Sequence, residues 1–251
     1  MAEGLSARQR AVKRGLDLVI AVPGLIVASP VILVAILVAT VDTREFGLFA
    51  QARIGRDGVP FTTYKIRTMR SSRDLTTTVT HANDTRITRS GKVMRRAKLD
   101  ELPQLINVVR GDMSLVGPRP DVPGFADQLV GEDRVILTLR PGITGPATLA
   151  FRDEEALLAA AADAERYNRD IIWPQKVELN RRYVVHWSLR RDVRYLLRTL
   201  VPTRVPRRPL EAHSCSALSS AEARRGRHPK TLDVPHTRAA TRARSDSWRL
   251  H

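Results

Sequence analysis

The longest apolar run in the chain lies near its start. The segment from Leu18 to Val41, LVIAVPGLIVASPVILVAILVATV, contains no charged residue. Because a helix rises about 1.5 Å per residue and the hydrocarbon core of a bilayer is about 30 Å thick, the run predicts a membrane helix. It is too long for the apolar part of a cleaved signal peptide, and no small-residue cleavage pattern ends it.

Two prolines complicate a simple membrane span. Pro23 and Pro30 each remove a helix hydrogen bond, and Ser29 carries a hydroxyl that can satisfy a freed carbonyl, so we expect a kink. Basic residues flank both ends of the run, which means that the positive-inside bias does not place the ends on opposite faces. The residues by themselves fit both a kinked span and a helix-break-helix hairpin that enters and leaves by one face. The flanking residues are Arg10, Lys13 and Arg14 before the run, and Arg44, Arg53 and Arg56 after it.

The pattern after the apolar run predicts a mixed domain. Residues 45–69 have β-prone stretches on either side of a glycine-rich turn at 55–58, as in a hairpin. Residues 70–90 are polar and predict a loop. Residues 90–111 carry apolar positions at helical spacing and predict two short helices that meet near Asp100, with Gly111 ending the second.

The remaining segments complete an α+β fold class. Residues 140–155 predict loop and turn, and residues 154–200 predict two or three amphipathic helices. The arginine-rich end of the chain has few large apolar residues, which is typical of disorder. We therefore divide the chain into an N-terminal segment (1–12), a membrane helix (13–44), a mostly helical cytosolic domain with a β-hairpin (45–202) and a basic tail (203–251).

The overall charge narrows the class of partner. Lysine and arginine total 42 against 26 acidic residues, a net charge of +16, which favours nucleic acid, anionic lipid or phosphorylated substrates. The single cysteine, Cys215, excludes an internal disulfide framework. The basic tail supports a nucleic-acid binder, but it has one aromatic residue, Trp248, and no zinc motif, so it suits anionic lipid equally well.

Two adjacent acids, Asp100 and Glu101, stand among basic residues in AKLDELPQLINVVRGDMSLVGPRPD. If Asp100 caps a helix that begins at Glu101, Pro103 falls in the first turn and both carboxylates lie at a positive helix end, which also attracts phosphate. Neighbouring helical positions point about 100° apart, so the two acids suit different tasks. In this interpretation one acid attacks a phosphoryl group while the other holds a metal, for which Mg²⁺ is the natural choice.

The alternative is a purely structural role, in which Asp100 only caps the helix and the basic residues form a solvated face. The nearby basic candidates are Arg95, Arg96, Lys98 and Arg119.

At this point the chain resembles the bacterial sugar transferases, or monotopic phosphoglycosyl transferases, in their short catalytic-core form. The resemblance rests on an ordered set of segments: KRGLDL, the SP pair of the apolar run, QARIGRDGVPFTTYKIRTM, TRITRSGKVMRRAKLDELPQLINVVRGDMSLVGPRP, RPGITG and ERYNRDIIWPQKVELNRRYV. Two stretches depart from the family pattern. TREFGLF replaces a Gly-Pro turn, and PATLAFRDEE follows RPGITG, where it is expected to affect sugar preference.

The resemblance assigns roles to residues. It implies that Asp100 is a nucleophile forming a phosphosugar intermediate, that Glu101 is a Mg²⁺ ligand, and that Ser29 and Pro30 make a re-entrant helix that does not cross the membrane. It also implies that basic residues bind the substrate phosphates, although Lys65 and Arg67 suit a structural role near the membrane almost as well. The implied substrate-binding residues are Arg95, Arg96, Arg119, Lys65 and Arg67.

The implied reaction moves a sugar 1-phosphate from a nucleotide sugar, expected to be a UDP-sugar, to polyprenyl phosphate at the cytoplasmic face of a bacterial membrane. The expected partners are these two substrates, membrane lipids and downstream glycosyltransferases, with no nucleic acid. Two alternatives stay open on the residues alone. They are a non-catalytic membrane scaffold and a basic binder of nucleic acid or anionic lipid.

Overall fold

The structure, a computed structural model, describes residues 4–71 and 84–200, and its longest element is helix α1 (Ala7–Thr43). The helix begins earlier than the predicted boundary at residue 13. Ser6 accounts for this, because its hydroxyl accepts a hydrogen bond from the Gln9 amide at 3.3 Å, while the Ser6 amide donates to Gln9 Oε1 at 2.8 Å. This reciprocal capping box satisfies free N–H groups at the helix start.

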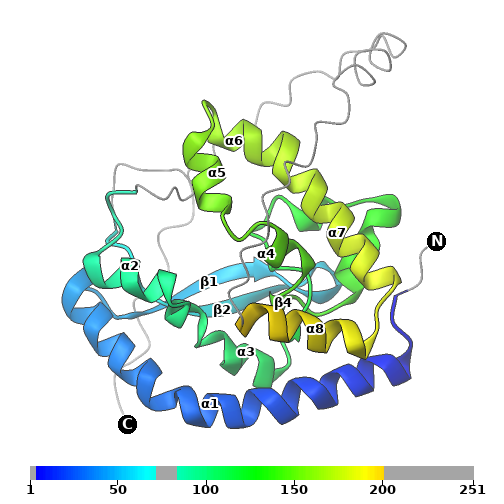
Figure 1. Ribbon diagram of the computed structural model, residues 1–251, viewed down its shortest axis with the longest axis horizontal. Coiled ribbons are helices and arrows are strands. Elements are labelled where there is room, and N and C mark those ends of the chain that lie inside the picture. Colours follow the sequence, from blue (N-terminus) through cyan, green and yellow to red (C-terminus); the bar gives the residue numbers. More distant parts are fainter. Residues whose placement is uncertain (1–3, 72–83, 201–251) are drawn as a thin grey trace, which may run out of the picture. The chain divides into compact units, whose positions relative to one another are not determined.

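Helix α1 continues through both of its prolines. Pro23 and Pro30 lie inside the helix, and the Ser29 hydroxyl donates to the Ile26 carbonyl at 2.8 Å. The predicted helix-break-helix is therefore not shown, and a single helix that bends along the domain takes its place (Figure 1). Ser29 makes the local hydrogen bond that was expected to accompany a proline in an apolar helix.

One face of α1 packs against the rest of the fold at both ends of the helix. Ala21 joins the main core, while Ile32, Ala35 and Ala39 form a second cluster with residues of β2 and α2. The opposite face is apolar and exposed, and the helix is long and apolar enough to cross a membrane. Its exposed residues include Val19, Ile26, Val27, Leu33, Val34, Leu37 and Val41.

The predicted β-hairpin is confirmed. Strands β1 (Leu48–Ile54) and β2 (Pro60–Ile66) pair antiparallel, with Leu48 opposite Ile66 and Ile54 opposite Pro60. The turn between them has positive φ at Asp57 and Gly58, and it closes with a hydrogen bond from the Gly55 amide to the Val59 carbonyl at 2.9 Å. Glycine and aspartate tolerate this left-handed backbone better than most residues, which explains the turn signal in the sequence.

A second, parallel strand pair was not predicted. β3 (Ser114–Val116) pairs with β4 (Gly142–Thr144), so part of the segment expected to be loop is a strand. Gly117 and Gly142 allow the two chains to meet closely, because a Cβ on Gly142 would lie 2.1 Å from the Gly117 amide nitrogen. This contact sets the position of the Gly-Pro-Arg-Pro turn that follows β3.

Short helices cover the two small sheets (Figure 1). The α+β class is confirmed as a mixture of helices and small sheets, and residues 154–200 hold four helices rather than two or three. Between α6 and α7 the chain makes one π-helical turn. The helices are α2 (Arg89–Arg96), α3 (Gln104–Arg110), α4 (Pro146–Ala150), α5 (Glu154–Ala160), α6 (Ala164–Tyr167), α7 (Trp173–Val185) and α8 (Leu189–Leu200).

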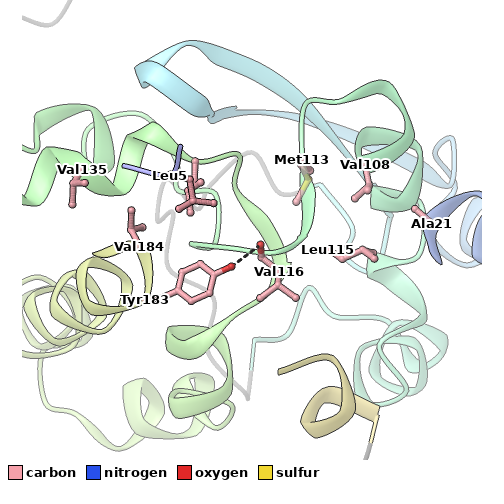
Figure 2. Packing of buried hydrophobic residues seen from close by; sticks show 10 residues of the cluster. Leu5, Ala21, Val108, Met113, Leu115, Val116, Val135, Tyr183 and Val184 are labelled. Carbon is pink, nitrogen blue, oxygen red and sulfur yellow. Dashed lines mark hydrogen bonds between the residues drawn. The ribbon is translucent and has the colours of Figure 1, made fainter. Parts of the chain in front are cut away.

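The main core joins distant parts of the chain (Figure 2). Leu5 and Ala21 meet residues of α3, β3 and α7 there, and the Tyr183 hydroxyl oxygen lies 3.3 Å from the Val116 carbonyl oxygen. Most of the predicted loop at 70–90 and the predicted tail at 203–251 lie outside the described residues. The packing fixes β3, and with it the turn that carries Arg119.

Candidate active site

Asp100 and Glu101 lie in a 3₁₀ turn, Leu99–Glu101, between α2 and α3. The prediction that Asp100 caps a helix starting at Glu101 is wrong. Lys98 adopts a left-handed backbone with φ of 58°, which redirects the chain after α2, and α3 begins only at Gln104 with Pro103 at its cap position. Both carboxylates therefore project from a tight turn, and not from the positive end of an α-helix.

Glu101 is held by two basic side chains. Arg119 donates a hydrogen bond to Glu101 Oε1, and Lys65 Nζ lies 3.7 Å from the same oxygen. Burial opposes ionisation, but Arg119 and Lys65 outweigh it and lower the pKa of Glu101 to about 2. The negative charge of Glu101 in turn raises the pKa of Arg119. Glu101 is thus a permanently ionised carboxylate at neutral pH.

Asp100 has the opposite environment. Its Oδ1 atom is buried and has no hydrogen-bond partner among the described residues. Burial and the neighbouring charge of Glu101 raise the pKa of Asp100. A buried, unpartnered carboxylate oxygen is costly to keep and is rare in folded proteins, so it indicates a functional group. The two acids are adjacent in sequence, yet Glu101 is held in ion pairs, whereas Oδ1 of Asp100 has no hydrogen-bond partner in the described part of the chain.

Lys65 supplies a positive charge that depends on pH. Burial, together with the nearby charge of Arg119, lowers the pKa of Lys65 to about 8. Its side chain comes from β2, whereas Arg119 comes from the turn after β3. The fold therefore brings two cations from distant segments to one carboxylate.

The other predicted basic residues separate into different surroundings. Arg95 turns inward and donates to Thr68 Oγ1 and Glu155 Oε1, each at 3.0 Å. Arg96, its neighbour on α2, is exposed. Arg67 is not brought to the acidic pair, because it pairs with Glu45 at 3.0 Å beside the end of α1 and lies over the Phe49 ring.

Sequence reasoning missed further charged residues around Arg119. Burial raises the pKa of Asp121 to about 6, and the nearby cations Lys176 and Arg53 limit this rise. Arg53 donates to the Pro120 carbonyl at 3.3 Å, and so it holds the turn that carries Arg119. Lys176 pairs with Glu154 at 2.6 Å. Arg53 and Asp121 each lie inside a quoted motif, but only the fold shows that these motifs meet.

The acidic pair can accept a metal ion only together with a ligand. Among residues 4–71 and 84–200, no cluster of three or more histidine, cysteine, aspartate or glutamate side chains could hold one. Mg²⁺, however, is commonly bound by one or two carboxylates while substrate phosphates and water complete its shell. The unpartnered oxygen of Asp100 and the ionised Glu101 fit that mode, and they do not form an all-protein metal cage.

Comparison with known families decides what kind of protein carries this arrangement. The family model described as "Bacterial sugar transferase" matches residues 8–204, which include α1, the hairpin and the acidic pair. The chain belongs to this bacterial sugar transferase family. It is therefore an enzyme, and the resemblance seen in its motifs is confirmed. The bacterial sugar transferase family is membrane-associated, and the exposed apolar face of α1 is consistent with membrane association.

Curated relatives of this sugar transferase carry informative names. The chain is 36% identical over 192 residues to "UDP-glucose:undecaprenyl-phosphate glucose-1-phosphate transferase" of Caulobacter vibrioides, covering 75% of this chain and 68% of the relative. It is 34% identical over 193 residues to "UDP-N-acetylgalactosamine-undecaprenyl-phosphate N-acetylgalactosaminephosphotransferase" of Aeromonas hydrophila, covering 75% of this chain and 43% of that one. It is 30% identical over 204 residues to "Exopolysaccharide production protein ExoY" of Sinorhizobium fredii, covering 75% and 83%. The first two names give different sugars at similar identity.

Proposed function

We propose that this sugar transferase moves a sugar 1-phosphate from a UDP-sugar to undecaprenyl phosphate, and so initiates the synthesis of a bacterial glycan. The observation that carries the proposal is the asymmetry of the acidic pair. Asp100 has a buried oxygen with no hydrogen-bond partner within residues 4–71 and 84–200, while Glu101 is ionised and fixed by Arg119. Family membership and the names of the relatives support the same reaction class.

The chemistry is a pair of displacements at phosphorus. An Asp100 carboxylate oxygen attacks the sugar-bearing phosphorus, the bond from that phosphorus to the bridging oxygen breaks, and UMP leaves with the bond electrons. An oxygen of undecaprenyl phosphate then attacks the aspartyl phosphorus and releases the Asp100 carboxylate. The product is an undecaprenyl diphosphate sugar, and neither displacement consumes a proton or an oxidant.

Positioned cations favour both displacements. Lys65 and Arg119 lie beside Glu101 and can neutralise phosphate oxygens at Asp100. Arg95, which faces Thr68 and Glu155, is a third candidate for a phosphate that reaches the α2 side of the site. Glu101 would hold Mg²⁺ together with the donor diphosphate, and the ion would neutralise charge on the departing nucleotide.

The arrangement of α1 supports a site at the membrane surface. Leu99 and Leu102, on either side of the acidic pair, pack against the cluster that includes Ile32, Ala35 and Ala39 of α1. A membrane-bound acceptor would therefore reach Asp100 near the level of the lipid headgroups. We further propose that α1 is re-entrant: it enters the membrane from the cytoplasmic face and returns to the same face. This topology is suggested because both parts of the helix pack on the same domain.

Labelling of single cysteines tests this topology. In a Cys215→Ser background, we expect cysteines introduced by Arg8→Cys and Arg44→Cys to react with an impermeant maleimide from the cytoplasmic side. Both positions flank the apolar run of α1. Reaction of the two sites from opposite sides of the membrane would instead mean that α1 spans it.

UMP release tests the reaction itself. Protein in nanodiscs would be assayed with Mg²⁺, undecaprenyl phosphate and a panel of UDP-sugars that includes UDP-glucose and UDP-N-acetylgalactosamine. We expect release with at least one donor and none after chelation of Mg²⁺. A folded, membrane-bound protein that releases UMP from no donor in the panel would contradict the proposal.

The pH dependence of kcat/KM provides a second test, because this quantity reports pKa values of the free enzyme. Lys65 carries its charge below about pH 8 and loses it as the pH rises through that value, so activity should decline on the alkaline side. The raised pKa of Asp100 should produce a decline of kcat/KM on the acidic side, where the carboxylate takes up a proton.

The variant Lys65→Arg tests the alkaline limb. Its arginine stays charged at high pH, so the alkaline decline in kcat/KM should disappear. An alkaline limb unchanged in this variant would remove Lys65 from the mechanism.

A further inference from the structure

Helix α2 has an inward face that is fully used by the fold. Met94 is buried against α1, and the Ser90 hydroxyl donates to Asp42 Oδ2 of α1 at 2.5 Å. Thr88 caps the helix by accepting a hydrogen bond from the Gly91 amide at 3.0 Å, and Arg95 turns toward Thr68 and Glu155. These contacts fix the rotation of α2 about its axis.

The outward face of α2 carries three cations on one stripe. Arg89, Lys92 and Arg96 are all exposed, and their spacing places them on the same side of the helix. Within the described part of the chain, none of the three forms an ion pair within 4.0 Å. Val93 shares this stripe and is 65% exposed. We call these four residues the α2 basic face.

The helix that carries the α2 basic face packs on the membrane helix α1. The two helices are in contact, through Met94 in the cluster of Ile32, Ala35 and Ala39. On the other side of that part of α1, Leu33, Val34, Leu37 and Val41 are exposed. Cations next to a membrane-embedded apolar surface lie at the level of lipid phosphates, where anionic headgroups attract them.

We propose that the α2 basic face binds the headgroups of anionic phospholipids, such as phosphatidylglycerol, next to the active site. Charge complementarity and the contact between α2 and the apolar helix α1 select this occupant. Nucleic acid is a poorer fit, because α2 contains no aromatic side chain on which bases could stack. The assignment gives Arg96 a role in lipid binding, in place of the substrate binding that the sequence suggested. The proposal rests on the membrane placement proposed above, which has its own readout in the experiment below.

The test is partition of the full-length protein from dilute detergent into vesicles, separated by flotation. Vesicles of phosphatidylcholine alone would be compared with vesicles containing about one third phosphatidylglycerol, at low and high salt. Two cations near an anionic surface contribute about fivefold each, so Arg89→Gln/Lys92→Gln should reduce the preference for anionic vesicles roughly 25-fold at low salt. High salt should reduce it in the wild type as well. Partition into pure phosphatidylcholine should stay unchanged, because it depends on α1.

A matched control removes the same charge elsewhere. Arg166 and Arg169 are exposed near α6, which lies at the end of the view away from α1 in Figure 1. Arg166→Gln/Arg169→Gln should keep the preference for anionic vesicles. Equal loss in this control would show that net charge alone produces the preference, and an unchanged Arg89→Gln/Lys92→Gln variant would overturn the proposal. A wild-type protein that does not partition into vesicles of pure phosphatidylcholine would instead contradict the membrane placement.

The kinetics in pure phosphatidylcholine separate lipid binding from acceptor binding. We expect Arg89→Gln/Lys92→Gln to keep the wild-type KM for undecaprenyl phosphate in that lipid. A KM raised tenfold or more there would assign the face to the acceptor and overturn the proposal. The single variant Lys92→Gln, expected to lose about fivefold in preference, guards against a folding defect in the double variant.

Discussion

Replacing Asp100 with asparagine is expected to lower UMP release by at least about 10⁴-fold, because loss of a covalent nucleophile removes the step on which catalysis depends. Asparagine has nearly the same shape as aspartate, and the Asp100 oxygen makes no hydrogen bond that the fold needs among the described residues. The variant should therefore fold and bind the membrane normally. Asp57→Asn, at the exposed tip of the β-hairpin, is the matched control and should keep full activity.

Mass spectrometry gives the same prediction a readout that does not depend on turnover. Wild-type enzyme incubated with a UDP-sugar and no acceptor should gain the mass of one sugar phosphate on the peptide that contains Asp100. Asp100→Asn should gain nothing. An Asp100→Asn enzyme with activity within tenfold of wild type would contradict the nucleophile assignment. A phosphosugar adduct on another residue would relocate the attack.

The second large effect is expected at Lys13, in the buried end of α1. Lys13 Nζ lies 2.7 Å from Asp192 Oδ2 on α8, and the side chain of Asp192 is fully buried. Tyr183 and Trp187 also donate to this carboxylate, at 2.7 and 3.0 Å. Lys13→Met leaves the Asp192 charge without its counter-ion, which should lower the free energy of unfolding by about 3–5 kcal/mol.

Thermal unfolding in detergent measures that loss. For a domain of this size we expect the midpoint to fall by about 10 °C. Lys13→Met/Asp192→Asn should recover much of the loss, because the buried charge is gone while an oxygen still accepts from Tyr183 and Trp187. Arg10→Met removes an exposed cation of the same helix and should change the midpoint little. A Lys13→Met midpoint equal to that of wild type would show that the ion pair contributes no net stability.

This ion pair has a consequence for the position of α1. Together with Asp17, which accepts hydrogen bonds from the Ser114 hydroxyl and the Leu115 amide at 3.0 Å each, Lys13 ties the start of α1 to β3 and α8. The later half of α1 packs on β2 and α2 through Ile32, Ala35 and Ala39. The helix is therefore attached to the domain at both ends, which is the arrangement expected if the active site must stay at a fixed height above the lipid.

Local patterns in the sequence were enough to predict several elements. Uninterrupted apolar character predicted the helix that holds Leu18 to Val41, glycines around Asp57 predicted the hairpin turn, and helical spacing predicted α2 and α3 on either side of Asp100. These features depend on hydrogen bonds and side-chain periods within about a dozen residues, so a single stretch of chain contains the information. The ordered motifs likewise indicated the family, which the match over residues 8–204 confirmed.

Other features depend on contacts between distant segments. The parallel pairing of β3 with β4 joins strands of three residues each, too short to carry a period of their own. The cap predicted for Asp100 failed because the left-handed backbone of Lys98 starts a 3₁₀ turn there, a choice that local propensity did not indicate.

The sequence by itself determined that this protein carries an apolar helix beside a small α+β domain with an acidic pair set among cations. Only the tertiary structure decided what each acid experiences. Lys65 comes from β2 and Arg119 from the turn after β3, and their convergence on Glu101 keeps it ionised, while a buried oxygen of Asp100 has no partner among the described residues. Neighbours in the chain share a sequence context, but electrostatic environment is set by atoms a few ångströms away in space, and these come from anywhere in the chain.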